Sequence, residues 1–293
     1  MQDLSNIGQI SELKIDGNRS IRYLKTGEGH PLILLHTIRT QLDYFAGVIP
    51  QLSKHFTVYA MDLPGHGYSS IDTQANYDEP YFRSAVIAFI EKLDLKEVTL
   101  VGESIGAVLA LTVASQLPSR IKQVVSSNPY DYDKKYGDGV RRGNFLANFV
   151  IGQFAIPYVG AMVAAMENLL FLGLIMKGGL RNKSWMPANL LKEFDRVGRR
   201  KGYRHVERST FSGWQSWHNA QTLYAAVKAP VKLVYGEFDW STLAERQSTA
   251  NALGGIHALS LANTGHFAFV DNPQKMLEIV LANQSSMQDN HGH

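Results

Sequence analysis

The sequence predicts an α/β protein in which a mostly parallel central sheet carries helices on both faces. Short, continuously apolar runs, such as residues 31–35 and 98–101, alternate along the chain with segments of helical length. Strands that are apolar throughout are typical of a parallel sheet buried on both faces. With 293 residues and 45% hydrophobic residues, the chain has enough material for one core domain with an insertion.

Each element is predicted from its apolar pattern and from the turn residues beside it. Two early strands can form a hairpin through Asp16-Gly17, and the last helix begins at Asn272-Pro273, where proline suits a first helical turn. In chain order, strands are expected at 10–15, 20–25, 31–35, 56–61, 98–101, 121–127, 231–235 and 256–261, and helices at 81–93, 107–114, 242–252 and 272–283.

The alternation stops between residues 130 and 224, where only helical periodicity is found, so we expect a helical cap (lid) inserted into the core. The boundaries predicted are a core of residues 1–129 and 225–284, a cap of 130–224 and a polar tail of 285–293. Residues 143–166 carry no charge, but Gly152, Pro157 and Gly160 interrupt them and argue against an integral membrane span. Two interpretations remain: cap helices packed on the core, or a roof over a hydrophobic pocket with Phe149, Phe154, Met162, Met166 and Phe171 in it.

Composition limits the function classes. The formal charge of +3 is small and spread out, so we expect no nucleic-acid partner. The absence of cysteine excludes disulfides and thiolate metal sites, and no metal or organic cofactor is called for. The first ten residues lack a basic region followed by an apolar stretch, so a cytoplasmic protein is expected. The oligomeric state stays open.

The segment Gly102-Glu103-Ser104-Ile105-Gly106 is the strongest motif of the chain. It lies between a predicted strand and a predicted helix, which is the setting of a G-x-S-x-G nucleophile elbow. In such a turn a Cβ at either glycine clashes, and the serine Oγ is presented at the positive end of a helix. Ser104 is therefore the candidate catalytic nucleophile.

A serine nucleophile needs a base and an acid that orients the base. Asp239 follows the strand at 231–235, and His266 follows the strand that ends near residue 261. Both therefore lie at the carboxyl ends of strands, as Ser104 does, where the loops converge at one site. Asp239 could instead cap the next helix, and Glu237 is the alternative acid. One oxyanion donor is expected at the N–H of Ile105 and another in the loop 36–40.

With these motifs, the chain resembles a capped, lid-bearing α/β-hydrolase. Asp62-Leu63-Pro64-Gly65-His66-Gly67-Tyr68-Ser69 is similar to the family's D-x-P-G-x-G-x-S loop, and residues 265–273 are similar to its histidine segment. The resemblance implies an α/β-hydrolase fold, a triad of Ser104, Asp239 and His266, and oxyanion N–H groups at Ile105 and Ile38. The resemblance is only weak evidence for which reaction is catalysed, because proteins of this fold catalyse many different reactions.

The chain also departs from the family pattern. It has His36-Thr37 where the family usually has His-Gly, a feature that hydroxynitrile lyases of this fold share. Those lyases also share the Gly-Glu-Ser sequence of the elbow, but they have a lysine where this chain has Phe267. Epoxide hydrolases and haloalkane dehalogenases are similar in architecture, yet their elbow nucleophile is an aspartate, so Ser104 argues against both.

The predicted function is a serine hydrolase for a carboxylic ester or thioester with a hydrophobic acyl part. The predicted partner is thus a small, hydrophobic substrate. Candidate substrate-binding residues are Thr37, Arg39 and Trp214, although Arg39 could pair with Asp43 or a cap carboxylate. Trp214 could equally pack in the core, as could Trp217. A C–C bond hydrolase of ring-cleavage products, to which Arg39 would also be suited, a hydroxynitrile-lyase-like enzyme and a non-catalytic ligand receptor are the alternatives.

Overall fold

A mixed eight-stranded sheet forms the centre of the molecule in our computed structural model, which describes residues 6–154, 169–182 and 186–282. Its strand order is β1-β2-β4-β3-β5-β6-β7-β8. The hairpin of β1 and β2 joins β4 in antiparallel fashion, and all further neighbours pair in parallel. The bounds are β1 Gln9–Asp16, β2 Arg19–Thr26, β3 Pro31–Leu35, β4 Thr57–Met61, β5 Val98–Glu103, β6 Ile121–Ser127, β7 Val231–Gly236 and β8 Ala258–Leu261.

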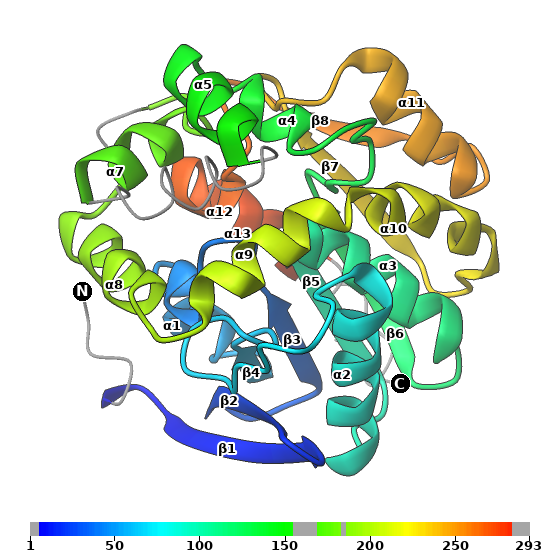
Figure 1. Cartoon of the computed structure of the whole chain (residues 1–293). Coiled ribbons are helices and arrows are strands. Elements are labelled where there is room, and N and C mark those ends of the chain that lie inside the picture. Colours follow the sequence, from blue (N-terminus) through cyan, green and yellow to red (C-terminus); the bar gives the residue numbers. More distant parts are fainter. Residues whose placement is uncertain (1–5, 155–168, 183–185, 283–293) are drawn as a thin grey trace, which may run out of the picture.

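Helices cover both faces of this sheet (Figure 1), which confirms the predicted fold class. Asp78 begins α2 by accepting a hydrogen bond from the Tyr81 N–H, and Thr242 and Glu245 form a capping box at α11. The core helices are η2 Leu42–Phe45, α1 Ile49–Leu52, α2 Glu79–Lys92, α3 Ile105–Gln116, α11 Leu243–Ala252, α12 Ala268–Asp271 and α13 Pro273–Leu281. The short elements η2, α1 and α12 were not predicted, because four residues carry no helical period.

All described elements between β6 and β7 are helical, and those two strands are parallel neighbours in the sheet. The helices lie across the top of the sheet in Figure 1. Their bounds are α4 Asp138–Arg141, α5 Phe145–Phe154, α7 Leu169–Lys177, α8 Ala188–Gly198, α9 Tyr203–Ser212, α10 Trp214–Asn219 and η3 Ala220–Ala226. We refer to them as the cap helices; the division at residues 130 and 224 remains a prediction, and the predicted polar tail lies outside the described residues.

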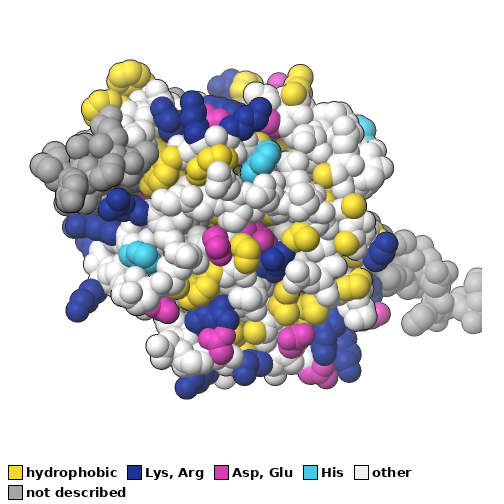
Figure 2. All heavy atoms as spheres, turned by 45° about the vertical axis from the view of Figure 1, so that its right-hand side comes forward, with side chains coloured by type: hydrophobic (Ala, Val, Ile, Leu, Met, Phe, Trp, Pro, Cys, Tyr) yellow, Lys and Arg dark blue, Asp and Glu magenta, His cyan; other side chains and the backbone are white. Residues whose placement is uncertain are grey.

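The uncharged stretch is only partly described, and its aromatic residues differ in their placement. Phe149 is 57% exposed, so its predicted place in a roof over a pocket is wrong. Met162, Met166 and the side chains of Phe154 and Phe171 lie outside the described residues. Within the described ranges, every helix is too short or too polar to cross a membrane. On the face in Figure 2, hydrophobic side chains are interspersed with acidic and basic ones.

Candidate active site

The nucleophile elbow joins β5 to α3, and its geometry explains both glycines. Ser104 has φ 60° and ψ −120°, a strained conformation that the tight turn imposes. A Cβ on Gly102 would lie 2.1 Å from the Gly106 carbonyl oxygen, and a Cβ on Gly106 would lie 2.1 Å from the Leu35 carbonyl oxygen. Only glycine fits at either place, so the turn can hold Ser104 at the N-terminus of α3.

Ser104, His266 and Asp239 form one buried hydrogen-bonded chain. His266 Nε2 lies 2.9 Å from Ser104 Oγ, and His266 Nδ1 lies 2.5 Å from Asp239 Oδ1. Burial alone would raise the pKa of the Asp239 carboxyl, but the imidazole and the hydrogen bonds from Ser241 outweigh it and keep that pKa below its ordinary value. The carboxylate is thereby kept ionised, as a partner of an imidazolium must be.

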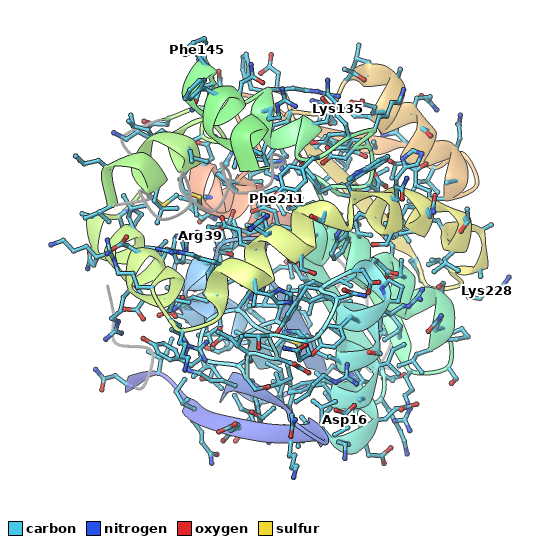
Figure 3. The ribbon with its side chains drawn as sticks, in the orientation of Figure 1. Asp16, Arg39, Lys135, Phe145, Phe211 and Lys228 are labelled. Atoms are coloured by element: carbon cyan, nitrogen blue, oxygen red, sulfur yellow. The ribbon has the colours of Figure 1, made fainter. Side chains whose placement is uncertain are left out.

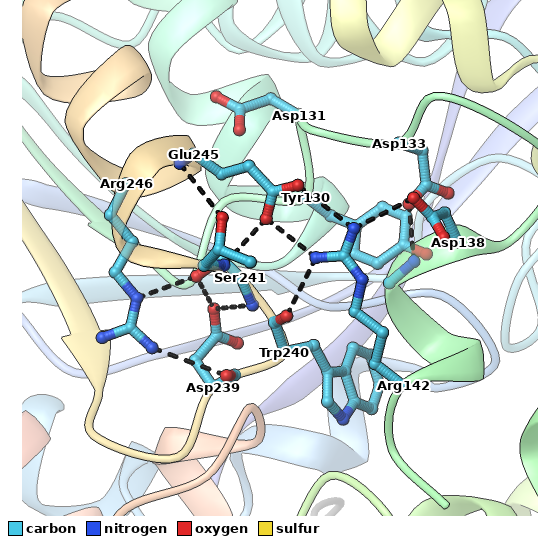
Figure 4. A network of polar contacts seen from close by, with 12 residues as sticks. Tyr130, Asp131, Asp133, Asp138, Arg142, Asp239, Trp240, Ser241, Glu245 and Arg246 are labelled. Atoms are coloured by element: carbon cyan, nitrogen blue, oxygen red, sulfur yellow. Dashed lines mark hydrogen bonds and ion pairs between the residues drawn. The ribbon is translucent and has the colours of Figure 1, made fainter. Parts of the chain in front are cut away.

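The loop that carries Asp239 is clamped from two helices. Arg142, at the end of α4, donates to the Trp240 carbonyl oxygen at 3.2 Å and pairs with Glu245 at 2.8 Å (Figure 4). Arg246 donates to Ser241 Oγ at 3.0 Å, and Ser241 in turn donates from its backbone N–H to Asp239 Oδ2 at 3.0 Å. These bonds fix the carboxylate toward His266, whereas the alternative acid Glu237 is exposed and accepts from the Asn263 N–H at 2.9 Å.

The loop after β3 brings a second set of backbone N–H groups near the elbow. His36 is buried, and its Nε2 accepts from the Leu63 N–H at 2.9 Å, which ties this loop to the Asp62–Ser69 segment. Burial lowers the pKa of His36 to about 4, so its imidazole stays neutral. Ile38 and Ile105 line one small cavity together, and the Ile105 N–H stands in the first turn of α3, where helical N–H groups lack intrahelical acceptors.

Two small cavities, the apolar lobe and the aromatic lobe, both have Ile38 and Phe211 among their lining residues. The apolar lobe has a free volume of about 40 Å³ and the aromatic lobe about 10 Å³. The apolar lobe is lined mainly by cap residues and by aromatic residues of the core: Thr37, Ile38, Arg39, Val140, Ile151, Leu172, Ile175, Met176, Glu207, Phe211, Trp240 and Phe267. The aromatic lobe is lined by Ile38, Ile105, Tyr130, Asp133, Thr210, Phe211, Trp214 and Trp217.

A cavity of about 730 Å³ lies elsewhere, between η2, α8, α12 and α13, and Ser104, His266 and Asp239 do not line it. Those three residues are not among the lining residues of the two lobes either, but Ile105, which directly follows Ser104, lines the aromatic lobe, so we place the chemistry beside that lobe. Figure 3 shows Arg39 and Phe211 close to the middle of the molecule beside α9.

The predicted substrate-binding residues all line these lobes, but with different partners. Thr37 is buried, and its Oγ1 has no hydrogen-bond partner among the described residues. Arg39 is 8% exposed and pairs with Glu207, a cap carboxylate, at 3.4 Å, rather than with a surface group. Trp214 lines the aromatic lobe beside Trp217, which is buried and packs against Phe82 with ring centres 5.6 Å apart.

Two residues of the site were not predicted. Trp240 stacks on the His266 imidazole with ring centres 3.8 Å apart and donates to the Gly178 carbonyl oxygen of the cap. Glu103 is buried; it accepts from the Tyr44 hydroxyl, from Ser127 Oγ and from the N–H of Ala268, two residues after His266. Burial raises the pKa of Glu103 to about 8. Trp240 directly follows Asp239 and Glu103 directly precedes Ser104 in the sequence. This proximity was the sequence feature that could have indicated their place in the site.

Across the described ranges, His, Asp and Glu side chains form no group of three that could hold a metal ion. The site contains the Ser104 hydroxyl within hydrogen-bond distance of the base His266, with backbone N–H groups and the N-terminus of α3 beside it. Such an arrangement can attack an electrophilic carbon and stabilise the oxyanion that results.

Comparison with known proteins agrees with this architecture. The sequence profile of the family described as alpha/beta hydrolase fold matches residues 30–273. The chain is an α/β-hydrolase. It is 33% identical to an (E)-2-((N-methylformamido)methylene)succinate hydrolase of Acinetobacter baylyi over 116 residues. This matched segment is 40% of this chain and 44% of that relative. It is 30% identical over 103 residues to a 2-hydroxymuconate semialdehyde hydrolase of a Pseudomonas strain, 34% of this chain and 36% of that relative.

These matched segments span less than half the length of either relative. Among solved structures, a putative epoxide hydrolase from Pseudomonas aeruginosa superimposes on this hydrolase with a TM-score of 0.78 and 18% identity, over 96% of this chain and 97% of the other. At that identity the likeness concerns the fold alone. Family membership and hydrolase relatives make the protein an enzyme, as predicted; the bond it cleaves is a separate question.

Proposed function

We propose that this α/β-hydrolase is a serine hydrolase that cleaves a carboxylic ester or thioester with a short hydrophobic acyl part. The observation that carries the proposal is the Ser104–His266–Asp239 chain, with 2.9 and 2.5 Å between successive partners, at the head of α3 beside an apolar cavity. A hydroxyl on an imidazole that a buried carboxylate orients is the arrangement acyl transfer requires.

The mechanism follows from the same contacts. His266 Nε2 takes the proton of Ser104 Oγ as the oxygen attacks the substrate carbonyl. The N–H groups of Ile105 and Ile38 stabilise the oxyanion, while Asp239 holds the imidazole tautomer and its positive charge. His266 then gives its proton to the leaving alcohol or thiol. Water, activated by the same imidazole, hydrolyses the acyl-enzyme.

The size and lining of the cavity support the substrate class. An apolar lobe of about 40 Å³ near the elbow supports a small apolar acyl group. The unpartnered Thr37 Oγ1 can donate one hydrogen bond to a substrate oxygen, which would relieve the cost of a buried polar group without a partner. The substrate is thus expected to combine a small apolar part with an oxygen close to the reacting carbonyl.

Initial hydrolysis rates on p-nitrophenyl esters and acyl-CoA thioesters of two to twelve carbons test the proposal, with Ser104→Ala as the control. We expect kcat/KM to peak at short acyl groups and to vanish in Ser104→Ala, while the melting temperature of that variant stays close to wild type. Hydrolysis of the same esters at an undiminished rate by Ser104→Ala would refute the mechanism.

A second candidate is a C–C bond hydrolase for an acidic substrate, and Arg39 is the observation that favours it. The guanidinium lines the apolar lobe, where it could meet a substrate carboxylate. Glu207, however, already pairs with it at 3.4 Å, so the charge is compensated inside the protein. We therefore rank this candidate second.

Paired substrates separate the two candidates: p-nitrophenyl butyrate against p-nitrophenyl hemisuccinate, and 2-hydroxymuconate semialdehyde as a C–C substrate. The ester proposal expects the neutral ester to have the higher kcat/KM. Preference for the charged ester, together with Ser104-dependent turnover of the C–C substrate, would favour the second candidate.

A further inference from the structure

Arg39 is bound to the cap in a way that neither the catalytic chain nor substrate contact requires. It follows Ile38 directly, at the end of the loop that leaves β3. Its guanidinium reaches two cap helices at once: Nη1 donates to the Phe194 carbonyl oxygen of α8 at 3.1 Å, and Nε lies 3.4 Å from a Glu207 oxygen on α9. It also lies 5.1 Å from the centre of the Tyr203 ring. These three groups belong to the cap helices.

The backbone at Arg39 is held in the left-handed region, with φ 64°. For a residue with a Cβ this conformation costs on the order of 1–2 kcal/mol, so the surroundings must enforce it. Within the loop, the Thr40 N–H and hydroxyl donate to the Thr37 carbonyl oxygen at 3.4 and 2.8 Å and close the turn around Arg39. At the side-chain end, the guanidinium is held by its cap contacts. If they were lost, relaxation of φ to a negative value would rotate the preceding chain, including Ile38, away from its present direction.

A glycine at the end of α8 leaves the space that the Arg39 side chain occupies. Gly198, the last residue of α8, leaves the space in which the guanidinium lies; a Cβ there would stand 2.0 Å from Arg39 Nη1. Phe194 lies near the C-terminus of α8, and its carbonyl oxygen accepts from Arg39 Nη1 at 3.1 Å; helix C-termini favour positive charge.

From these contacts we propose that Arg39 is a positioning residue that couples the cap to the oxyanion loop: its seat on α8 and α9 holds the Ile38 N–H in the direction that oxyanion binding needs. The proposal rests on the ester-hydrolase function for its catalytic part. The proposal explains why Arg39 is buried, is paired with Glu207 and directly follows the oxyanion donor Ile38. An arginine that binds a substrate carboxylate would instead need a charge that no protein carboxylate already compensates.

Gly198→Ala tests this without altering any residue of the catalytic chain or the loop. The new methyl group displaces the flexible guanidinium, while alanine raises the helix propensity of α8, so folding is retained. Gly152→Ala in α5 is the matched control, because its Cβ would make only ordinary contacts, the nearest at 3.6 Å to Arg141.

We expect kcat of Gly198→Ala on p-nitrophenyl butyrate to fall about tenfold with KM within about twofold, a part of the hundred- to thousandfold that one oxyanion donor supplies. Gly152→Ala should keep both constants. Glu207→Gln, which keeps the shape but weakens the ion pair, should lower kcat severalfold in the same direction. Unchanged kcat in Gly198→Ala at an unchanged melting temperature, or an equal loss in Gly152→Ala, would overturn the proposal.

Hydrogen exchange supplies a readout that does not depend on activity. Amides in the peptide that contains residues 36–41 should exchange faster in Gly198→Ala and Glu207→Gln than in wild type and Gly152→Ala. Equal exchange in all four proteins would contradict the coupling. If Ser104→Ala kept its activity while this exchange difference appeared, the function proposal would fail and the coupling of cap and loop would stand.

Discussion

Replacing Asp239 by asparagine changes one hydrogen-bonding atom at the buried end of the catalytic chain. Asp239 Oδ1 faces His266 Nδ1 at 2.5 Å, while Oδ2 accepts from both the N–H and the hydroxyl of Ser241. Asparagine has a single acceptor oxygen, and the fixed Ser241 N–H claims it. The amide NH₂ then points at His266 Nδ1, which must accept.

The imidazole is thereby forced into the tautomer that carries its proton on Nε2, directed at Ser104 Oγ. In that form it cannot take the serine proton, so general-base catalysis is lost. The expected decrease in kcat is on the order of 10⁴, or about 5 kcal/mol of transition-state stabilisation. KM should change little, because Asp239 does not line the cavity lobes.

Steady-state hydrolysis of p-nitrophenyl butyrate between pH 6 and 9 measures this loss. Glu237→Gln serves as the control, since Glu237 is exposed, lies on the same loop and was the alternative acid; its kcat should stay within about twofold of wild type. Retention of more than a tenth of wild-type kcat in Asp239→Asn, or a large loss in Glu237→Gln, would refute the assignment of the acid.

Three further outcomes are expected. Thr37→Val removes an unpartnered hydroxyl at constant shape, so kcat/KM for short esters should fall about two- to twelvefold, the worth of one hydrogen bond, while thermal stability does not decrease; equal kinetics would show that the hydroxyl meets no substrate. Trp240→Leu removes the ring stacked on His266, and kcat should fall about tenfold as imidazolium stabilisation is lost, with Trp240→Phe in between. Because burial raises the pKa of Glu103 to about 8, the folded state holds a proton that the unfolded state releases, so stability falls as pH rises toward that value. Between pH 7 and 8 the wild type should lose about 1 kcal/mol more than Glu103→Gln, as urea unfolding at the two pH values would show. Asp131 and Asp133, whose pKa burial raises to about 7, titrate alike in both proteins and cancel in this difference.

Local sequence was enough for the strands, for the longer core helices and for a mostly parallel sheet, but the order of the strands in the sheet was not predicted. The bounds of β3 and β6 agree with prediction to the residue, because continuous apolar runs ended by turn residues leave little choice. Strand β8 begins at Ala258 rather than at 256, where the apolar pattern is weak. The four-residue helices α1 and α12 escaped prediction because they are set by their neighbours, as the bond from the Ala268 N–H to Glu103 illustrates.

The sequence by itself determined that Ser104 stands on a strand–helix turn between two obligatory glycines, and that Asp239 and His266 follow strands of one parallel sheet. These are properties of short segments, in which sterics and strand polarity act locally. Only the tertiary structure decided that Asp239 rather than Glu237 faces His266, that Trp240 covers the imidazole, and that Arg39, which lines the cavity, pairs with Glu207 of the cap. Each of these depends on groups more than 20 residues apart, whose distances no local pattern encodes, and on burial, which makes an unpaired charge too costly and so selects its partner.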